Sequence, residues 1–179
     1  MATRRLGIVM YGVTGRMGLN QHLVRSIVAI RDQGGVALPG GDRIMPDPIL
    51  VGRNAEKVGA LAKQYGFERS TADLDAALSD PRDEVFFDAA TTQMRADLLT
   101  RAIQAGKHVY CEKPVAPTAA QALTLLRQVE RRVEIGRPIC DLVVARDCGQ
   151  APGIAPDEQQ TRQQTVLLQR EPAFGDDRS

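Results

Sequence analysis

Three glycines spaced three residues apart near the amino terminus form the first pattern with a chemical meaning. Gly12, Gly15 and Gly18 follow a short apolar run and precede a stretch with helical periodicity, so they mark a turn between a strand and a helix. Glycines in that setting let the backbone approach a pyrophosphate, which the first amide groups of the helix bind. The alternative is a turn that needs small residues for packing alone. The residues expected to contact the dinucleotide here are Gly12, Thr14, Gly15, Arg16 and Met17.

The end of the second predicted strand indicates which dinucleotide would bind. Arg53 and Asn54 stand there, and neither is the acidic residue that binds the ribose 2′-hydroxyl in NAD-specific folds. Arg53, assisted by Arg16, could pair with a 2′-phosphate, because a guanidinium matches the geometry of phosphate oxygens. NADP is therefore favoured over NAD, and Arg53 and Asn54 are expected to bind the cofactor. The alternative for Arg53 is a solvated loop charge.

The most specific pattern in the chain is residues 105–116, which read AGKHVYCEKPVA. This segment resembles the Gly-Lys-His-Val strand and Glu-Lys-Pro signature of the Gfo/Idh/MocA family of NAD(P)-dependent oxidoreductases. The resemblance runs from residue 1 to about 133. It implies hydride transfer between a nicotinamide cofactor and a secondary alcohol of a sugar, cyclitol or similar polyol, with homo-oligomers common in the family.

The resemblance also implies roles for three adjacent residues. Lys113 would be the catalytic residue, standing beside the nicotinamide and polarising the substrate oxygen. A lysine desolvated next to a cationic ring has its ammonium form disfavoured, so it can relay a proton. Glu112 would orient the cofactor or the lysine, and Pro114 would fix the turn, often through a cis peptide bond. A surface Glu-Lys pair before a turn proline is the alternative, but it leaves the preceding match unexplained.

Two threonines end the strand before this segment. The family has a threonine and a proline near the nicotinamide ribose, followed shortly by a histidine. This chain has Thr91 and then Thr92 in place of the proline, and Arg95 at the expected histidine position. Thr91 and Thr92 are expected to bind the ribose through a hydroxyl or the backbone, or else to cap the next helix.

The remaining chemically reactive residues are expected to be structural. His22 should lie on a helix face and His108 in a strand, and neither belongs to a pattern that would bind a metal. Cys111 should be a packed thiol rather than a nucleophile. The three cysteines lack paired spacing, so we expect free thiols.

Hydrophobic periodicity predicts the elements that position these residues. The expected strands are residues 6–11, 49–52, 84–90 and 108–112, and the expected helices are residues 19–30, 55–65, 73–78, 95–104 and 118–133. Residues 33–48 contain four glycines and three prolines and are expected to form an inserted loop. This alternation predicts an α/β fold, a doubly wound parallel sheet of the Rossmann type. Ligands bind beyond the carboxyl ends of such strands, which would bring the predicted residues to one rim.

Composition is that of a globular protein with small-molecule chemistry. The chain has 179 residues, 43% of them hydrophobic, and a formal charge of +1, which gives no reason to expect a nucleic acid or membrane partner. The short apolar run near the start resembles neither a signal sequence nor a membrane span, so a cytoplasmic location is expected.

The sequence changes character near residue 133. Residues 1–133 carry 18 basic and 14 acidic side chains, whereas residues 134–179 carry 5 and 8. We therefore expect a dinucleotide-binding domain over 1–133 and a poorly ordered tail over 134–179, with little periodicity outside residues 141–145 and 165–169. Forty-six residues are too few for the second α+β domain of the family, which suggests a truncated or frame-shifted product whose activity is uncertain.

Two other functions remain open from the sequence. A non-catalytic dinucleotide-binding module would keep the sheet and the cofactor but lack a closed substrate site. A relative of dihydrodipicolinate reductase would share the stretch from Gly15 to Gly18, but that enzyme's own catalytic motif does not appear here.

Overall fold

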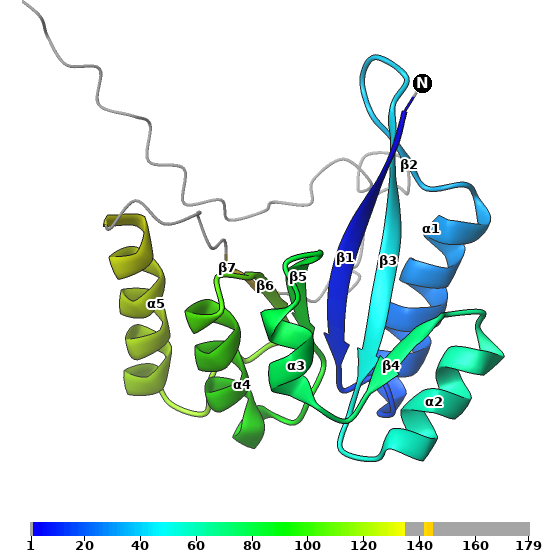
Figure 1. Cartoon of the computed structure of the whole chain (residues 1–179). Coiled ribbons are helices and arrows are strands. Elements are labelled where there is room, and N and C mark those ends of the chain that lie inside the picture. Colours follow the sequence, from blue (N-terminus) through cyan, green and yellow to red (C-terminus); the bar gives the residue numbers. More distant parts are fainter. Residues whose placement is uncertain (1, 135–141, 145–179) are drawn as a thin grey trace, which may run out of the picture. The chain divides into compact units, whose positions relative to one another are not determined.

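The computed structural model describes residues 2–134 and 142–144, which form a layered α/β fold (Figure 1). The strands are β1 (Thr3–Tyr11), β2 (Val36–Ala37), β3 (Arg43–Val51), β4 (Arg69–Thr71), β5 (Asp83–Asp88), β6 (His108–Cys111) and β7 (Leu142–Val144). The helices are η1 (Gly18–Val28), α1 (Ala29–Asp32), α2 (Ala55–Gln64), α3 (Leu74–Ser79), α4 (Thr92–Gln104) and α5 (Ala119–Glu134).

The sheet confirms the predicted fold class. Its order is β2-β3-β1-β5-β6-β7, with β4 also paired to β3, and every pair is parallel except β2 with β3. If β2 is left aside, the parallel strands run β4-β3-β1-β5-β6-β7, the 3-2-1-4-5-6 order of the dinucleotide-binding Rossmann fold. The strand order reverses between β1 and β5, and the fold predicts a ligand at that point.

Alternate residues of the central strand β1 build a core on each face of the sheet. Ile8 and Met10 belong to one cluster, whereas Val9 and Tyr11 belong to the other. The helix residues of the two clusters include Leu23 and Val58 on the first face and Leu78, Leu99 and Leu125 on the second. Burial of each such side chain contributes about 1.5–3 kcal/mol, so the two layers of helices fix the sheet between them.

The prediction of an irregular loop over residues 33–48 is wrong. β3 begins at Arg43, and all nine of its residues pair with β1. Pro46 and Pro48 lack an amide hydrogen, but β2 pairs only with the first two residues of β3 and β4 only with its last three. The prolines therefore lie where one side of the strand has no neighbour, and Arg31 Nη1 donates to the Pro46 carbonyl at 2.7 Å.

Other predicted elements are confirmed with altered bounds or geometry. The first helix is present but is wound as a π-helix over Gly18–Val28 before it continues as α1. β4 was not predicted, because three residues are too few to show periodicity. The expected poorly ordered tail over 134–179 lies outside the described residues apart from Glu134 and β7, which adds a parallel strand beside β6.

Candidate cofactor site

Strand register brings the predicted site residues to one edge of the sheet. Tyr11 pairs with Val51 on one side and with Asp88 on the other, and Asp88 pairs with Cys111. The glycine turn, Arg53-Asn54, Thr91-Thr92 and Glu112-Lys113 each follow one of these strand ends within a few residues. The predicted rim therefore exists, as the parallel topology requires.

The glycine turn needs at least two of its glycines for steric reasons. Gly12 has φ +86°, and a Cβ there would lie 2.5 Å from the Ala89 carbonyl carbon. A Cβ on Gly18 would lie 2.4 Å from the Gly12 oxygen, so this glycine lets the helix start against the turn. Gly18 was absent from the predicted contact residues, and its role is packing.

The outer side of the same turn is open to a ligand. A Cβ built on Gly15 would meet only the Gly12 oxygen among the described residues, at 3.4 Å. Thr14, Arg16 and Met17 are exposed beside it. The first amide groups of a helix have no partner within the helix, so this cradle fits a pyrophosphate.

A hollow of 530 Å³ lies against the start of the first helix. It is lined by Arg16, Met17, Asn20, Gln21, Val24 and Arg25. Two arginines give this hollow a positive charge, and Arg25 Nη1 donates to Gln21 Oε1 at 3.2 Å. The position of Arg16 and Met17 is thus consistent with a contact to a charged ligand.

At the end of β3 the two predicted residues differ in what they do. Arg53 is exposed. Asn54 is the N-cap of α2, where its Oδ1 accepts a hydrogen bond from the Lys57 amide at 2.9 Å. The Asn54 side chain therefore has a structural role that the sequence interpretation did not assign to it.

At the end of β5, Thr91 is the N-cap residue of α4 and Thr92 its first residue. The Thr91 side chain makes no capping hydrogen bond. Thr91 therefore occupies the capping position of α4 without a side-chain hydrogen bond to the helix.

Glu112 has a partner that the sequence did not suggest. Its carboxylate is paired with the His22 ring through Oε1 and Nε2, and each side chain is 16% exposed. The His22 ring also lies 4.7 Å from the Phe87 ring, which stacks on Tyr110 at 5.2 Å. His22 thus links the first helix to the end of β6. Its position one turn beyond the glycines is the signal that could have revealed this role.

Lys113 is exposed, and its peptide bond to Pro114 is cis. The turn that holds both residues is linked to the end of β5 by Arg95, which is 2% exposed. Arg95 Nε donates to Asp88 Oδ2 at 2.5 Å, and Nη1 donates to the Pro114 carbonyl at 2.6 Å. The sequence marked Arg95 only as a departure from the family pattern, and the buried ion pair was missed.

Burial sets the ionisation of two groups behind this turn. Desolvation raises the pKa of Asp88, although hydrogen bonds from Arg95 and from the Ala90 amide oppose the shift. Desolvation also raises the pKa of the Cys111 thiol to about 12. Cys111 is a free and fully buried cysteine, which confirms the packed thiol that the sequence predicts.

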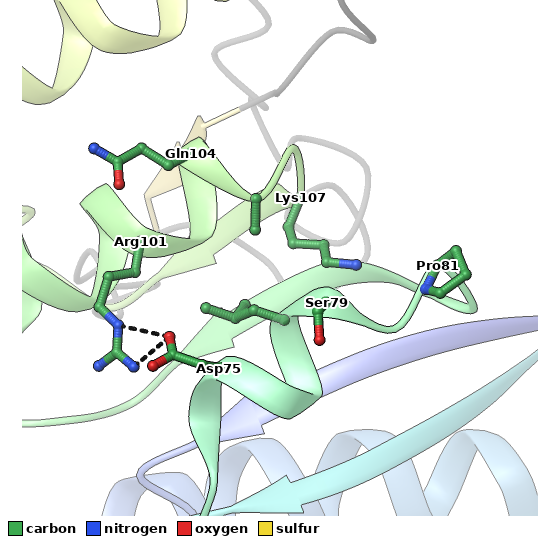
Figure 2. Close-up of a pocket in the computed structure, with 8 residues that line it drawn as sticks. Asp75, Ser79, Pro81, Arg101, Gln104 and Lys107 are labelled. Atoms are coloured by element: carbon green, nitrogen blue, oxygen red, sulfur yellow. Dashed lines mark hydrogen bonds and ion pairs between the residues drawn. The ribbon is translucent and has the colours of Figure 1, made fainter.

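A second hollow lies at the opposite edge of the sheet, near the start of β6 (Figure 2). Its volume is 430 Å³, and Arg101 Nη2 donates to Asp75 Oδ1 across it at 2.6 Å. Lys107 Nζ donates to the carbonyls of Asp80 and Asp83 at 2.7 Å and 2.5 Å. The cations Arg101 and Lys107 at this edge are therefore both bound by groups of the protein itself.

The described part of the chain has neither a cluster of metal ligands nor a helix that could span a membrane. Among these residues no group of three or more histidine, cysteine, aspartate and glutamate side chains is placed to hold a metal ion. None of the helices described is both long and apolar enough to cross a bilayer.

Comparisons with known proteins agree with this geometry. D-xylose dehydrogenase of Paenarthrobacter nicotinovorans is 46% identical over 120 residues, which is 67% of this chain and 31% of that protein. Levoglucosan dehydrogenase of Pseudarthrobacter phenanthrenivorans is 32% identical over 82 residues, 46% of this chain and 21% of that protein. The chain therefore spans a third or less of the length of these relatives.

Solved structures give the same relationship. A levoglucosan dehydrogenase in complex with NADH and levoglucosan matches with a TM-score of 0.59 and 27% identity, over 71% of this chain and 32% of that one. An NAD-binding oxidoreductase of Klebsiella pneumoniae matches with a TM-score of 0.63 and 26% identity, over 79% and 34%. The model of the oxidoreductase family with an NAD-binding Rossmann fold matches residues 7–135. This chain belongs to that family, Gfo/Idh/MocA.

Proposed function

We propose that this chain is the nucleotide-binding part of an NAD(P)-dependent sugar dehydrogenase. The observation that carries the proposal is the convergence of the open glycine turn and the Glu112-Lys113-Pro114 turn on one edge of the sheet. A dinucleotide in this fold spans the point where strand order reverses. Its pyrophosphate would contact Gly12, Thr14, Gly15, Arg16 and Met17.

We assign the two halves of the dinucleotide to the two sides of that point. The adenosine ribose belongs at the end of β3, beside Arg53 and Asn54, where the fold places the ribose-binding residue. The nicotinamide ribose then belongs at the ends of β5 and β6, beside Thr91, Thr92 and Glu112. A bound nicotinamide supplies the hydride donor or acceptor.

Lys113 is the proposed catalytic residue. Its exposed position at the carboxyl edge lets the ammonium donate a hydrogen bond to a substrate oxygen and move a proton at that atom. Glu112, which pairs with His22, and Pro114, which Arg95 holds, fix the backbone on either side of the lysine.

The proposed substrate is a sugar or related polyol, because the two named relatives are a xylose and a levoglucosan dehydrogenase. Both are named for a sugar whose carbinol carbon can yield a hydride. This chain spans only part of those relatives, so the proposal names the class of substrate and not the exact sugar. For the same reason, cofactor binding and not turnover of a sugar tests the proposal.

NADP is the favoured cofactor, and NAD the alternative. Arg53 is exposed where a 2′-phosphate would lie, and the strand ends without an acidic residue. An arginine paired with a phosphate contributes about 1.5–3 kcal/mol, which is about 10- to 150-fold in affinity. The NADH complexes of the levoglucosan dehydrogenase keep NAD as a real alternative.

Calorimetric titration of the purified 179-residue chain with NADPH and NADH tests this proposal. We expect NADPH to bind more tightly, and Arg53→Ala to remove most of the difference while NADH affinity changes by less than about twofold. Lys57→Ala is the matched control, because it removes a positive charge at the exposed start of the same helix. Equal losses for both cofactors would rule out recognition of the 2′-phosphate.

A further inference from the structure

We propose that Arg95 is a positioning residue for the nicotinamide half of the site. Its guanidinium joins the end of β5 to the turn that carries Lys113, and so fixes where the lysine stands. This inference rests on the proposed function, because it assumes that a dinucleotide binds at this edge.

All three nitrogen atoms of the buried Arg95 guanidinium donate hydrogen bonds. Nε donates to Asp88 Oδ2 at 2.5 Å, Nη1 to the Pro114 carbonyl at 2.6 Å and Nη2 to the Ala90 carbonyl at 2.6 Å. Asp88 is 0% exposed and Arg95 is 2% exposed. Short bonds to three acceptors, two at the end of β5 and one in the turn after β6, make Arg95 a fixed link between these segments.

The link is needed because the strands stop short of the turn. β6 ends at Cys111, and the Glu112 amide donates to the Asp88 carbonyl at 3.0 Å in continuation of the ladder. Pro114 lies two residues further on, where no strand pairing reaches it. Arg95 makes the connection from its Nη1 to the Pro114 carbonyl instead.

Only arginine among the basic residues suits this geometry. Its planar group presents donors in three directions, whereas a lysine has one nitrogen at the end of a flexible stem and a histidine has two ring nitrogens. Asp88 neutralises the charge, so the pair adds no net charge to the site. The residue therefore acts through geometry and not through attraction of the phosphates.

The effect should be confined to one half of the dinucleotide. Arg95 contacts the end of β5 and the turn after β6, on the far side of β1 from the end of β3 that precedes Arg53. Adenosine 2′,5′-bisphosphate reproduces the adenosine end of NADP but lacks the nicotinamide. Comparison of this fragment with NADPH separates a local effect on the Lys113 turn from a general loss of structure.

The test is calorimetric titration of both ligands with the full chain and its variants. Arg95→Lys keeps the positive charge beside Asp88 but not all three bonds. We expect NADPH affinity to fall about tenfold, because the displaced turn also carries Glu112 beside the nicotinamide ribose, and the affinity for adenosine 2′,5′-bisphosphate to change less than about twofold. Arg69→Lys is the control, because Arg69 also pairs with a fully buried aspartate, Asp83, at the opposite end of β5, with bonds of 2.9 Å and 2.7 Å.

A second variant guards against loss of folding. Asp88→Asn combined with Arg95→Met removes both charges at once, which buried pairs tolerate better than loss of one partner. We expect the same selective loss of NADPH affinity. Unchanged NADPH binding in the variants, or an equal fall for both ligands, would overturn the assignment. If the wild-type chain binds neither ligand, the proposed function itself fails.

Discussion

Replacement of Gly12 by alanine should destabilise the chain more than the backbone angle alone explains. Gly12 has φ +86°, and its Cβ would lie within 2.7 Å of three backbone atoms of Ala89 and Ala90. A strained backbone angle costs about 1–3 kcal/mol, and overpacking of this kind costs about 1–3 kcal/mol more. The expected loss is therefore about 2–6 kcal/mol, a large share of the ~5–15 kcal/mol typical of a domain.

Gly66→Ala provides the matched control. Gly66 also has a positive φ, +68°, at the end of α2, but a Cβ there would meet nothing within 4 Å. This variant should lose only the cost of the backbone angle, about 1–2 kcal/mol, partly offset by about 0.4–1 kcal/mol from a less flexible unfolded chain. The difference in unfolding free energy between Gly12→Ala and Gly66→Ala therefore measures the contact of residue 12 with Ala89 and Ala90.

Urea unfolding followed by circular dichroism measures that difference. With a slope of about 2 kcal/mol per molar urea, an excess loss of about 2 kcal/mol moves the midpoint of Gly12→Ala about 1 M below that of Gly66→Ala. Equal midpoints for the two variants would refute the close approach of the glycine turn to β5.

Three further outcomes follow from the same contacts. Cys111 should resist thiol reagents at pH 8 in a chain with Cys140→Ser and Cys148→Ser, since burial raises the pKa of its thiol to about 12; rapid labelling before unfolding would contradict this. Hydrogen bonds from Arg82 hold the pKa of Asp80 at about 2, below its usual 3.8, so their contribution to stability is complete above pH 3.8 and disappears as the pH falls through 2. In Arg82→Ala, NMR titration should find the pKa of Asp80 back near 3.8, and an unchanged value would exclude Arg82 as the cause. Lys113→Ala should abolish any sugar oxidation by the chain while leaving NADPH affinity within about twofold, and undiminished turnover would exclude its catalytic role.

The fold could be predicted because strong local patterns coincide with it. Apolar strands, glycine-terminated helices and the turn at Gly12 are encoded within short windows, and the parallel order then follows from alternation alone. The position of the site residues along one rim could also be predicted, because the carboxyl ends of parallel strands share one edge of the sheet.

The errors arose where distant residues decide the outcome. Pro46 and Pro48 argue against a strand locally, yet β3 accepts them because its neighbours leave that side open. The interpretation of His22 as an ordinary helix-face residue missed Glu112, 90 positions away. Arg95 likewise binds the Asp88 carboxylate and the Pro114 carbonyl, which lie on separate segments of the chain. No local spacing in the sequence predicts such a buried ion pair.

The central claim is that a dinucleotide binds along the carboxyl edge of the sheet. Amide chemical shifts of the ¹⁵N-labelled chain, recorded as NADP is added, test it residue by residue. We predict shifts at Gly15 and Arg16, at Thr92 and at Lys113, with none around Arg101 at the opposite edge. Shifts confined to the hollow beside Asp75 and Arg101, or no shifts at millimolar NADP, would contradict the account.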